Sequence, residues 1–99
     1  MAAIASEQVL QTLAIHRPEL EKMGVKSLRL FGSVARDEAT DDSDIDFLVE
    51  FFEEPSLFEI FEVRYFLEDL FQRKIDIGLE EALREHLREP VLRDTIHAF

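Results

Sequence analysis

The sequence predicts a small α/β fold, one domain over residues 1–99 in which helices pack on a mixed sheet of about three strands. A chain of 99 residues has room for one hydrophobic core and little more. Hydrophobic residues make up 46% of the chain, so the material for that core is present. Helical and strand patterns then alternate along the chain, which is typical of helices packed on a sheet.

The N-terminal segment predicts a helix over residues 6–23. Ser6 can cap its start, apolar residues recur at roughly helical spacing, and Gly24 is a suitable stop. Pro18 falls inside this segment, so the helix is expected to kink or restart there.

Two strands and a short helix are expected next. Apolar and polar residues alternate over 25–31, and residues 45–52 are apolar at most positions, so both segments favour strands. The chain between them is expected to hold a strand end at Gly32-Ser33, one turn of helix over 34–36 and a polar, acidic loop over 37–43.

A long helix is expected over residues 56–72. Ser56 and Glu59 match a capping box directly after Pro55, and apolar residues continue at helical spacing. The rest of the chain is expected to form a short third strand over 74–78 and two helices, over 80–87 and 91–98, separated by Pro90.

The charge balance excludes several classes of function. The chain has 22 acidic residues against 11 Lys and Arg, a formal net charge of −11. That charge repels a phosphate backbone, so we expect no direct nucleic-acid binding, and a metal site or a basic partner fits better. The absence of cysteine excludes disulfides, thiolate zinc sites and cysteine nucleophiles. With no signal-peptide pattern and no apolar run of ~18–20 residues, a cytoplasmic location without membrane contact is expected.

Gly32-Ser33 is the first of three features that suggest chemistry. A glycine lets the backbone approach a ligand closely, and free N–H groups together with the Ser33 hydroxyl can hold a phosphate. Gly-Ser is also a common turn, so the pair alone has an ordinary structural explanation.

Asp44 and Asp46 are the second feature. Side chains alternate along a strand, so these carboxylates share one face, about 6.5–7 Å apart at Cα, while Ile45 points into the core. Two such carboxylates suit a hard cation such as Mg²⁺, and Asp41 and Asp42 add negative charge nearby. The alternative is an acidic turn whose carboxylates are solvated or cap local N–H groups.

Asp76, between Ile75 and Ile77, is the third feature. An edge strand with this acid turned outward is the simple explanation. Together with Asp44 and Asp46, however, it supplies the carboxylates for two-metal phosphoryl transfer. In that chemistry two ions about 3.5–4 Å apart activate the attacking oxygen and neutralise the departing pyrophosphate.

These motifs resemble the nucleotidyltransferase superfamily that includes DNA polymerase β. The resemblance rests on F-G-S-V-A-R over 31–36, ten residues between Ser33 and Asp44, and S-D-I-D-F-L-V over 43–49. The chain length and the motif sequences are most similar to those of the minimal nucleotidyltransferases of bacteria and archaea, which implies a small polymerase β-like fold. Many such relatives have glycine where this chain has Asp37, a departure that is expected to reshape the loop without removing a metal ligand.

The resemblance implies a site with two Mg²⁺ ions and ATP as substrate. Asp44 and Asp46 would bind both metals. Asp76 would help to hold the catalytic metal and to deprotonate the acceptor hydroxyl.

The nucleotide would be bound mainly by backbone and hydroxyl groups. Gly32 and Ser33 are implied to hold the triphosphate. Arg36 either approaches a phosphate or is an exposed helix arginine, and the sequence leaves both open.

The acceptor is implied to be a protein. Minimal nucleotidyltransferases are commonly paired with helical HEPN ribonuclease toxins, so a hetero-oligomer is expected in which AMP is transferred to a toxin tyrosine. Most aromatic residues of the 56–72 helix are expected in the core, but Phe58 or Tyr65 could lie on a partner surface. The alternatives are a non-catalytic antitoxin that neutralises its partner by binding, and a small-molecule nucleotidyltransferase.

Overall fold

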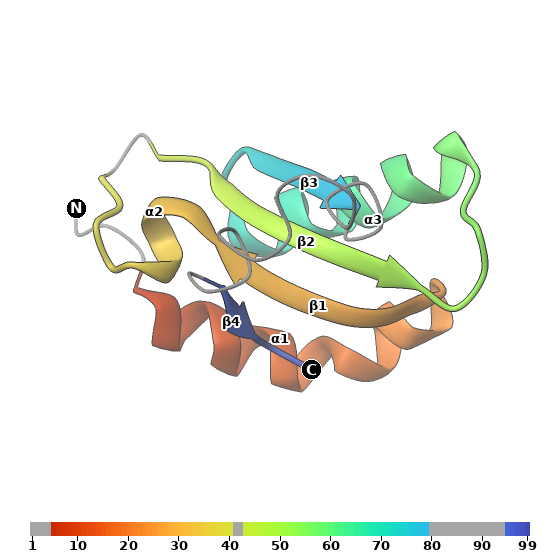
Figure 1. Cartoon of the computed structure of the whole chain (residues 1–99), viewed down its shortest axis with the longest axis horizontal. Helices are drawn as coiled ribbons and strands as arrows, with labels where there is room; N and C mark the ends of the chain where they lie inside the picture. Colours follow the sequence, from red (N-terminus) through yellow and green to blue (C-terminus); the bar gives the residue numbers. More distant parts are fainter. Residues whose placement is uncertain (1–4, 41–42, 80–94) are drawn as a thin grey trace.

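A four-stranded mixed sheet organises the molecule, with strand order β3-β2-β1-β4 (Figure 1). The computed structural model describes residues 5–40, 43–79 and 95–99. Strand β1 pairs antiparallel with β2 and with β4, and β2 pairs parallel with β3. The elements are α1 (Ser6–Lys22), β1 (Val25–Phe31), α2 (Gly32–Ala35), β2 (Ile45–Phe51), α3 (Leu57–Phe71), β3 (Ile75–Leu79) and β4 (Ile96–His97).

The hydrophobic core lies between the sheet and the two long helices. Rings of His16 in α1 and Phe66 in α3 meet edge to face, 6.0 Å between centroids, so the helices lie side by side against the sheet. The buried residues of the core come from the two long helices, the short helix α2 and three strands. They are Val9, Leu13, Leu20, Val25, Leu28, Leu30, Val34, Ile45, Phe47, Val49, Phe51, Val63, Leu67 and Ile75.

Most expected elements are confirmed. The expected strand over 25–31 has the bounds of β1, and the capping box of α3 forms, with the Ser56 hydroxyl accepting from the Glu59 N–H at 3.2 Å. Helix α1 continues through Pro18 and stops before Gly24, whose φ of +95° suits a glycine. None of the described helices is both long and apolar enough to cross a membrane.

The expected N-cap of α1 is wrong by one residue. Ala5 takes the N-cap position, and its N–H donates to the side chain of Gln8 at 3.1 Å. Ser6 is instead buried in the first turn, because its backbone and hydroxyl are both bound by Asp37.

The expected helix over 91–98 is wrong where the structure describes it. Ile96 and His97 form β4, opposite Leu30 and Arg29 of β1. The pairing extends past the strand, since the Leu28 carbonyl accepts from the N–H of residue 98 at 2.8 Å. Strand β1 thereby gains a partner on its second edge, and the sheet has four strands where about three were expected. The expected helix over 80–87 lies outside the described residues.

Candidate active site

Three carboxylates stand on the sheet face that points away from α1 and α3. In β2 the buried side chains Ile45, Phe47 and Val49 face the helices, so Asp46 between them points to the opposite side. Asp76 is directly opposite Asp46 in the parallel β2–β3 register, and adjacent strands lie about 4.8 Å apart.

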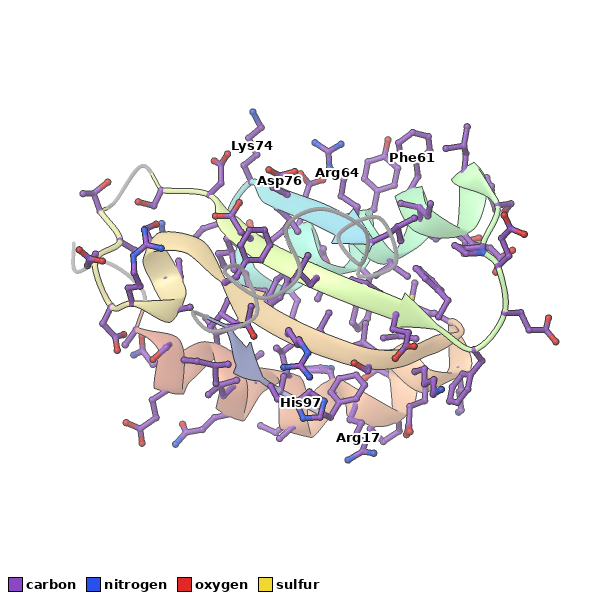
Figure 2. All side chains as sticks on the ribbon, in the orientation of Figure 1. Arg17, Phe61, Arg64, Lys74, Asp76 and His97 are labelled. Atoms are coloured by element: carbon purple, nitrogen blue, oxygen red, sulfur yellow. The ribbon has the colours of Figure 1, made fainter. Side chains whose placement is uncertain are left out.

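Asp44 is the residue directly before β2, and Asp46 is the second residue of that strand. The spacing of two residues gives Asp44 and Asp46 the same face, as the sequence predicts. Asp44 and Asp46 are half-buried, whereas Asp76 on the edge strand is exposed. Figure 2 shows Asp76 projecting from the outer edge of the sheet. The structure therefore places the three predicted acids on one face of the sheet, with Asp46 and Asp76 directly opposite one another.

The electrostatics of Asp46 show that these groups act on one another. Burial raises the pKa of the Asp46 carboxyl above its ordinary value of 3.8, and the negative charges of Asp76 and then Asp44 raise that pKa further. The Arg36 guanidinium acts in the opposite sense. The site therefore concentrates negative charge that a bound cation would relieve.

Two constraints favour glycine at position 32: its backbone conformation and the nearby carboxylate of Asp46. Its φ is +77°, a conformation that other residues rarely adopt. A Cβ at this position would overlap Oδ2 of Asp46 and lie 3.1 Å from its Cγ. The glycine thus lets the α2 turn close over the carboxylate, and Ser33 follows it in the first turn of α2, half-buried.

Arg36 lies at the C-cap of α2, exposed, beside the acids rather than among them. Its Nε donates to Oε1 of Glu38 at 2.6 Å, an exposed ion pair. Its effect on the pKa of Asp46 nevertheless places its charge within reach of the carboxylate site. The exposed side chain agrees with the alternative of an exposed helix arginine, and an approach to a phosphate stays a prediction.

Asp37 explains the departure from the family pattern. It has a φ of +56°, so the backbone keeps the left-handed conformation that glycine favours. Its Oδ1 accepts from the Ser6 N–H at 2.9 Å and its Oδ2 from the Ser6 hydroxyl at 3.1 Å. The loop after α2 is therefore tied to the start of α1.

Arg73 holds the loop that leads into Asp44, and sequence reasoning missed it. Its Nη1 donates to the carbonyl of Ser43 at 3.2 Å and to the carbonyl of Thr40 at 3.4 Å. Thr40 and Ser43 also bond each other, Ser43 N–H to Thr40 carbonyl at 3.1 Å. No local pattern marks Arg73, because its partners lie about thirty positions earlier in the chain.

Comparison with known proteins identifies the family. The profile of the family described as Nucleotidyltransferase domain matches residues 13–97. The chain belongs to the nucleotidyltransferase domain family.

The relatives of this nucleotidyltransferase include full-length matches. A protein adenylyltransferase named MntA, from Thermococcus cleftensis, is 37% identical over 98 residues, covering 98% of this chain and 99% of the relative. A solved structure described as a minimal nucleotidyltransferase is 36% identical with a TM-score of 0.79, covering 94% of this chain and 95% of its own. The α/β fold expected from the sequence is confirmed by this match.

More distant solved structures share the fold alone. One is a toxin–antitoxin crystal structure with AMP-PNP, 17% identical with a TM-score of 0.69, covering 97% of this chain and 73% of that one. Another is the mutant toxin–antitoxin pair of MntA and its toxin, 14% identical with a TM-score of 0.65 and the same coverage.

The donor chemistry of the nucleotidyltransferase site fits a hard divalent cation. Carboxylate oxygens are the ligands that Mg²⁺ prefers, and the pKa of Asp46 is raised first by burial and then by neighbouring negative charge that such an ion would neutralise. Within residues 5–40, 43–79 and 95–99, no three acidic or histidine side chains already close around one point. Asp41 and Asp42, which add negative charge in the sequence, lie outside those residues. The described carboxylates therefore share one side of the sheet without closing around a single point.

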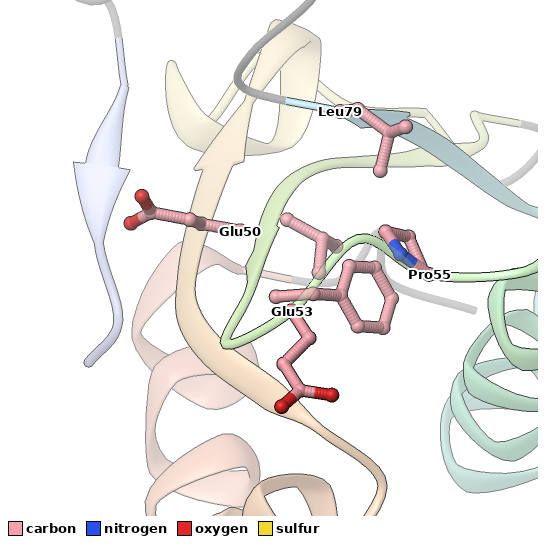
Figure 3. Close-up of a pocket in the computed structure, with 6 residues that line it drawn as sticks. Glu50, Glu53, Pro55 and Leu79 are labelled. Atoms are coloured by element: carbon pink, nitrogen blue, oxygen red, sulfur yellow. The ribbon is translucent and has the colours of Figure 1, made fainter.

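A shallow pocket at the far end of the sheet is a separate feature (Figure 3). It lies where β2 and β3 end, whereas Asp46 and Asp76 lie where the same strands begin. Its lining is largely apolar apart from two glutamates, so it suits neither a triphosphate nor the metal site. The residues are Val49, Glu50, Phe51, Glu53, Pro55 and Leu79.

Proposed function

We propose that this nucleotidyltransferase, as one domain over residues 1–99, is a metal-dependent protein adenylyltransferase that acts as an antitoxin. It transfers AMP from ATP to a tyrosine of a partner HEPN-family toxin. The observation that carries the proposal is the alignment of Asp46 with Asp76, with Asp44 on the same face, in a chain 37% identical to an MntA protein adenylyltransferase over nearly its whole length. A toxin–antitoxin structure with AMP-PNP shares the fold.

The reaction joins a tyrosine oxygen to the α-phosphorus of ATP. The bond between that phosphorus and the bridging oxygen to the β-phosphorus breaks, and pyrophosphate leaves with its electron pair. The phenolic proton passes to a carboxylate of the site, and Asp76 is the acid most open to an incoming acceptor because it is exposed on the edge strand.

The chain's own groups hold the reactants. Asp44 and Asp46 would hold two Mg²⁺ ions and Asp76 would share the catalytic one. When bound, the ions would neutralise charge on the phosphates and activate the acceptor oxygen. Gly32, which lies against Asp46, and Ser33, which follows it, would hold the triphosphate with backbone N–H groups and a hydroxyl.

Intact-mass spectrometry tests the proposal. The protein encoded beside this chain is incubated with the chain, ATP and Mg²⁺, and Asp44→Asn/Asp46→Asn serves as the matched control. We expect a mass gain of one or more AMP units with the parent chain only. A stable complex that gains no mass would instead support an antitoxin that neutralises by binding. AMP transfer to small molecules without a protein partner would support a small-molecule enzyme.

A further inference from the structure

Helix α3 exposes an aromatic surface that the fold does not use. Phe58 is 72% exposed, Phe61 46% and Tyr65 66%. Because an α-helix has 3.6 residues per turn, the i, i+3, i+7 spacing places these three side chains within about 60° of one another. We call Phe58, Phe61 and Tyr65 the α3 aromatic face.

The other side of α3 already supplies the core. Val63 and Leu67 are fully buried, and Ile60, Phe66 and Leu70 are partly buried against the same cluster. Among the residues that the structure describes, Phe58 and Tyr65 are therefore largely outside the packing of α3 on the sheet, and Phe61 is about half outside it. Three large aromatic side chains grouped on one helix, open to solvent, indicate an interaction site.

The charges that border the face indicate what binds there. Glu62 and Asp69 project along one side of it, both exposed. Along the other side lies Arg64, the one lysine or arginine within α3, which forms an ion pair with Glu68, its Nε 3.6 Å from Oε2. The charged α3 side chains that border the face are thus mostly acidic, in a chain whose net charge is −11.

An acidic border argues against a second copy of this chain as the occupant. A symmetric contact would place the same acids opposite one another, and both copies carry the same negative charge. The complementary occupant has an apolar groove with lysine or arginine at its rim.

We propose that the α3 aromatic face is the docking surface for the acceptor protein, through an apolar groove bordered by basic side chains. The inference rests on the proposed function for the existence of a protein acceptor, and it adds where and how that protein is held. The three aromatic residues follow the spacing by which a helix inserts into a groove.

The position of the face fits this role. Figure 2 shows Phe61, Arg64, Asp76 and Lys74 along one edge of the molecule, from α3 to the start of β3. Strand β3 is the sheet edge that carries the exposed carboxylate of Asp76. The acids stand on the sheet face opposite α3, so a tyrosine of a partner seated on α3 would reach them around the β3 edge.

Binding and catalysis are tested separately with the protein encoded beside this chain. Isothermal titration with Phe58→Ser/Tyr65→Ser is expected to give a Kd at least about 30-fold weaker than with the parent, the loss typical of two aromatic anchors. The matched control is Ile15→Ser, which removes an apolar side chain 74% exposed on α1, and it should leave the Kd unchanged. All variants should melt at or above the parent temperature, since none removes a buried side chain.

The acidic border is tested by charge reversal. Glu62→Lys/Asp69→Lys is expected to weaken binding about tenfold at low salt and to reduce its salt dependence, whereas Glu53→Lys in the loop before α3 should not. Tighter binding after reversal would overturn the acidic border as a recognition element.

The outcomes separate the two proposals. If the parent binds and adenylylates the neighbour and Phe58→Ser/Tyr65→Ser does both equally well, the docking surface is wrong and the proposed function stands. If the parent binds through this face and transfers no AMP, the proposed function is wrong and the docking surface stands. If the parent neither binds nor modifies the neighbour, or if this face instead joins two copies of the chain in light scattering, the docking proposal is overturned.

Discussion

Strand β2 has two faces that follow different rules. Towards the helices, Ile45, Phe47 and Val49 are at most 1% exposed and fill the core. On the opposite face, Asp46 stands beside Asp76 with its pKa raised by burial and by its acidic neighbours. One face stabilises the fold, and the other places like charges close together at a cost in stability. The site therefore depends on the core behind it, because alternate residues of a β-strand point to opposite faces of the sheet.

The largest effect is expected where the acidic face is neutralised. Asp46→Asn should reduce AMP transfer by about 10³-fold or more, since it removes a carboxylate that would hold both metals. The same change should raise the melting temperature of the metal-free protein by a few degrees, because it removes a charge that burial disfavours and that Asp76 and Asp44 repel. Transfer assays and thermal melts in EDTA measure the two effects. A variant less stable than the parent would contradict the claim that the charge of Asp46 destabilises the metal-free fold.

The pH dependence of that stability difference has a definite sign. The folded-state pKa of Asp46 is above its ordinary value of 3.8, so the folded chain binds the proton more tightly than the unfolded chain. The cost is therefore fully present above the folded-state pKa and is lost as the pH falls through it towards 3.8. The melting-temperature advantage of Asp46→Asn should be largest near neutral pH and shrink in acid.

The helix-facing side should respond in the opposite way. Phe47→Ala is expected to destabilise the fold by about 3–5 kcal/mol, because it empties a fully buried site whose ring lies 6.1 Å from that of Phe71. This loss is a large fraction of the stability of a small domain. Phe47→Leu keeps most of the volume and should retain transfer activity per folded molecule. Urea unfolding, together with transfer activity corrected for the folded fraction, distinguishes the two faces. A loss of activity in folded Phe47→Leu would contradict the claim that the helix-facing side affects stability alone.

A substitution at Gly32 should affect both properties. Gly32→Ala is expected to cost about 1–3 kcal/mol, because it combines a φ of +77° with overlap of the Asp46 carboxylate, and to reduce transfer by about 10²-fold. Gly78→Ala is the matched control on the same sheet face. Its Cβ would lie 3.2 Å from the flexible tip of Leu48, at an ordinary backbone conformation. Equal losses for the two variants would show that Gly32 has no special relation to the carboxylate.

Local patterns sufficed for some features, and tertiary contacts were needed for others. The bounds of β1 and the capping box of α3 depend on neighbouring residues, so the sequence predicts them. The short strand β4 has only two residues, too few for any periodicity to show. The cap that Asp37 provides and the loop contacts of Arg73 join residues about thirty positions apart, so only the folded chain reveals them.

Arg73 offers the finest test of how the acidic face is held. The Arg73→Gln variant loses the contacts to the carbonyls of Thr40 and Ser43, so the loop before Asp44 is expected to loosen and the Mg²⁺ affinity to fall about tenfold. Mg²⁺-dependent shifts in melting temperature measure this without relying on turnover. The control Lys74→Gln removes the same charge from the next residue while leaving those side-chain contacts in place. Loss of a positive charge beside three carboxylates should by itself strengthen cation binding, so the two explanations predict opposite signs. Weaker Mg²⁺ binding in Arg73→Gln, with unchanged or stronger Mg²⁺ binding in Lys74→Gln, would show that the guanidinium acts by positioning the loop. Stronger Mg²⁺ binding in both variants would show that it acts only as a charge.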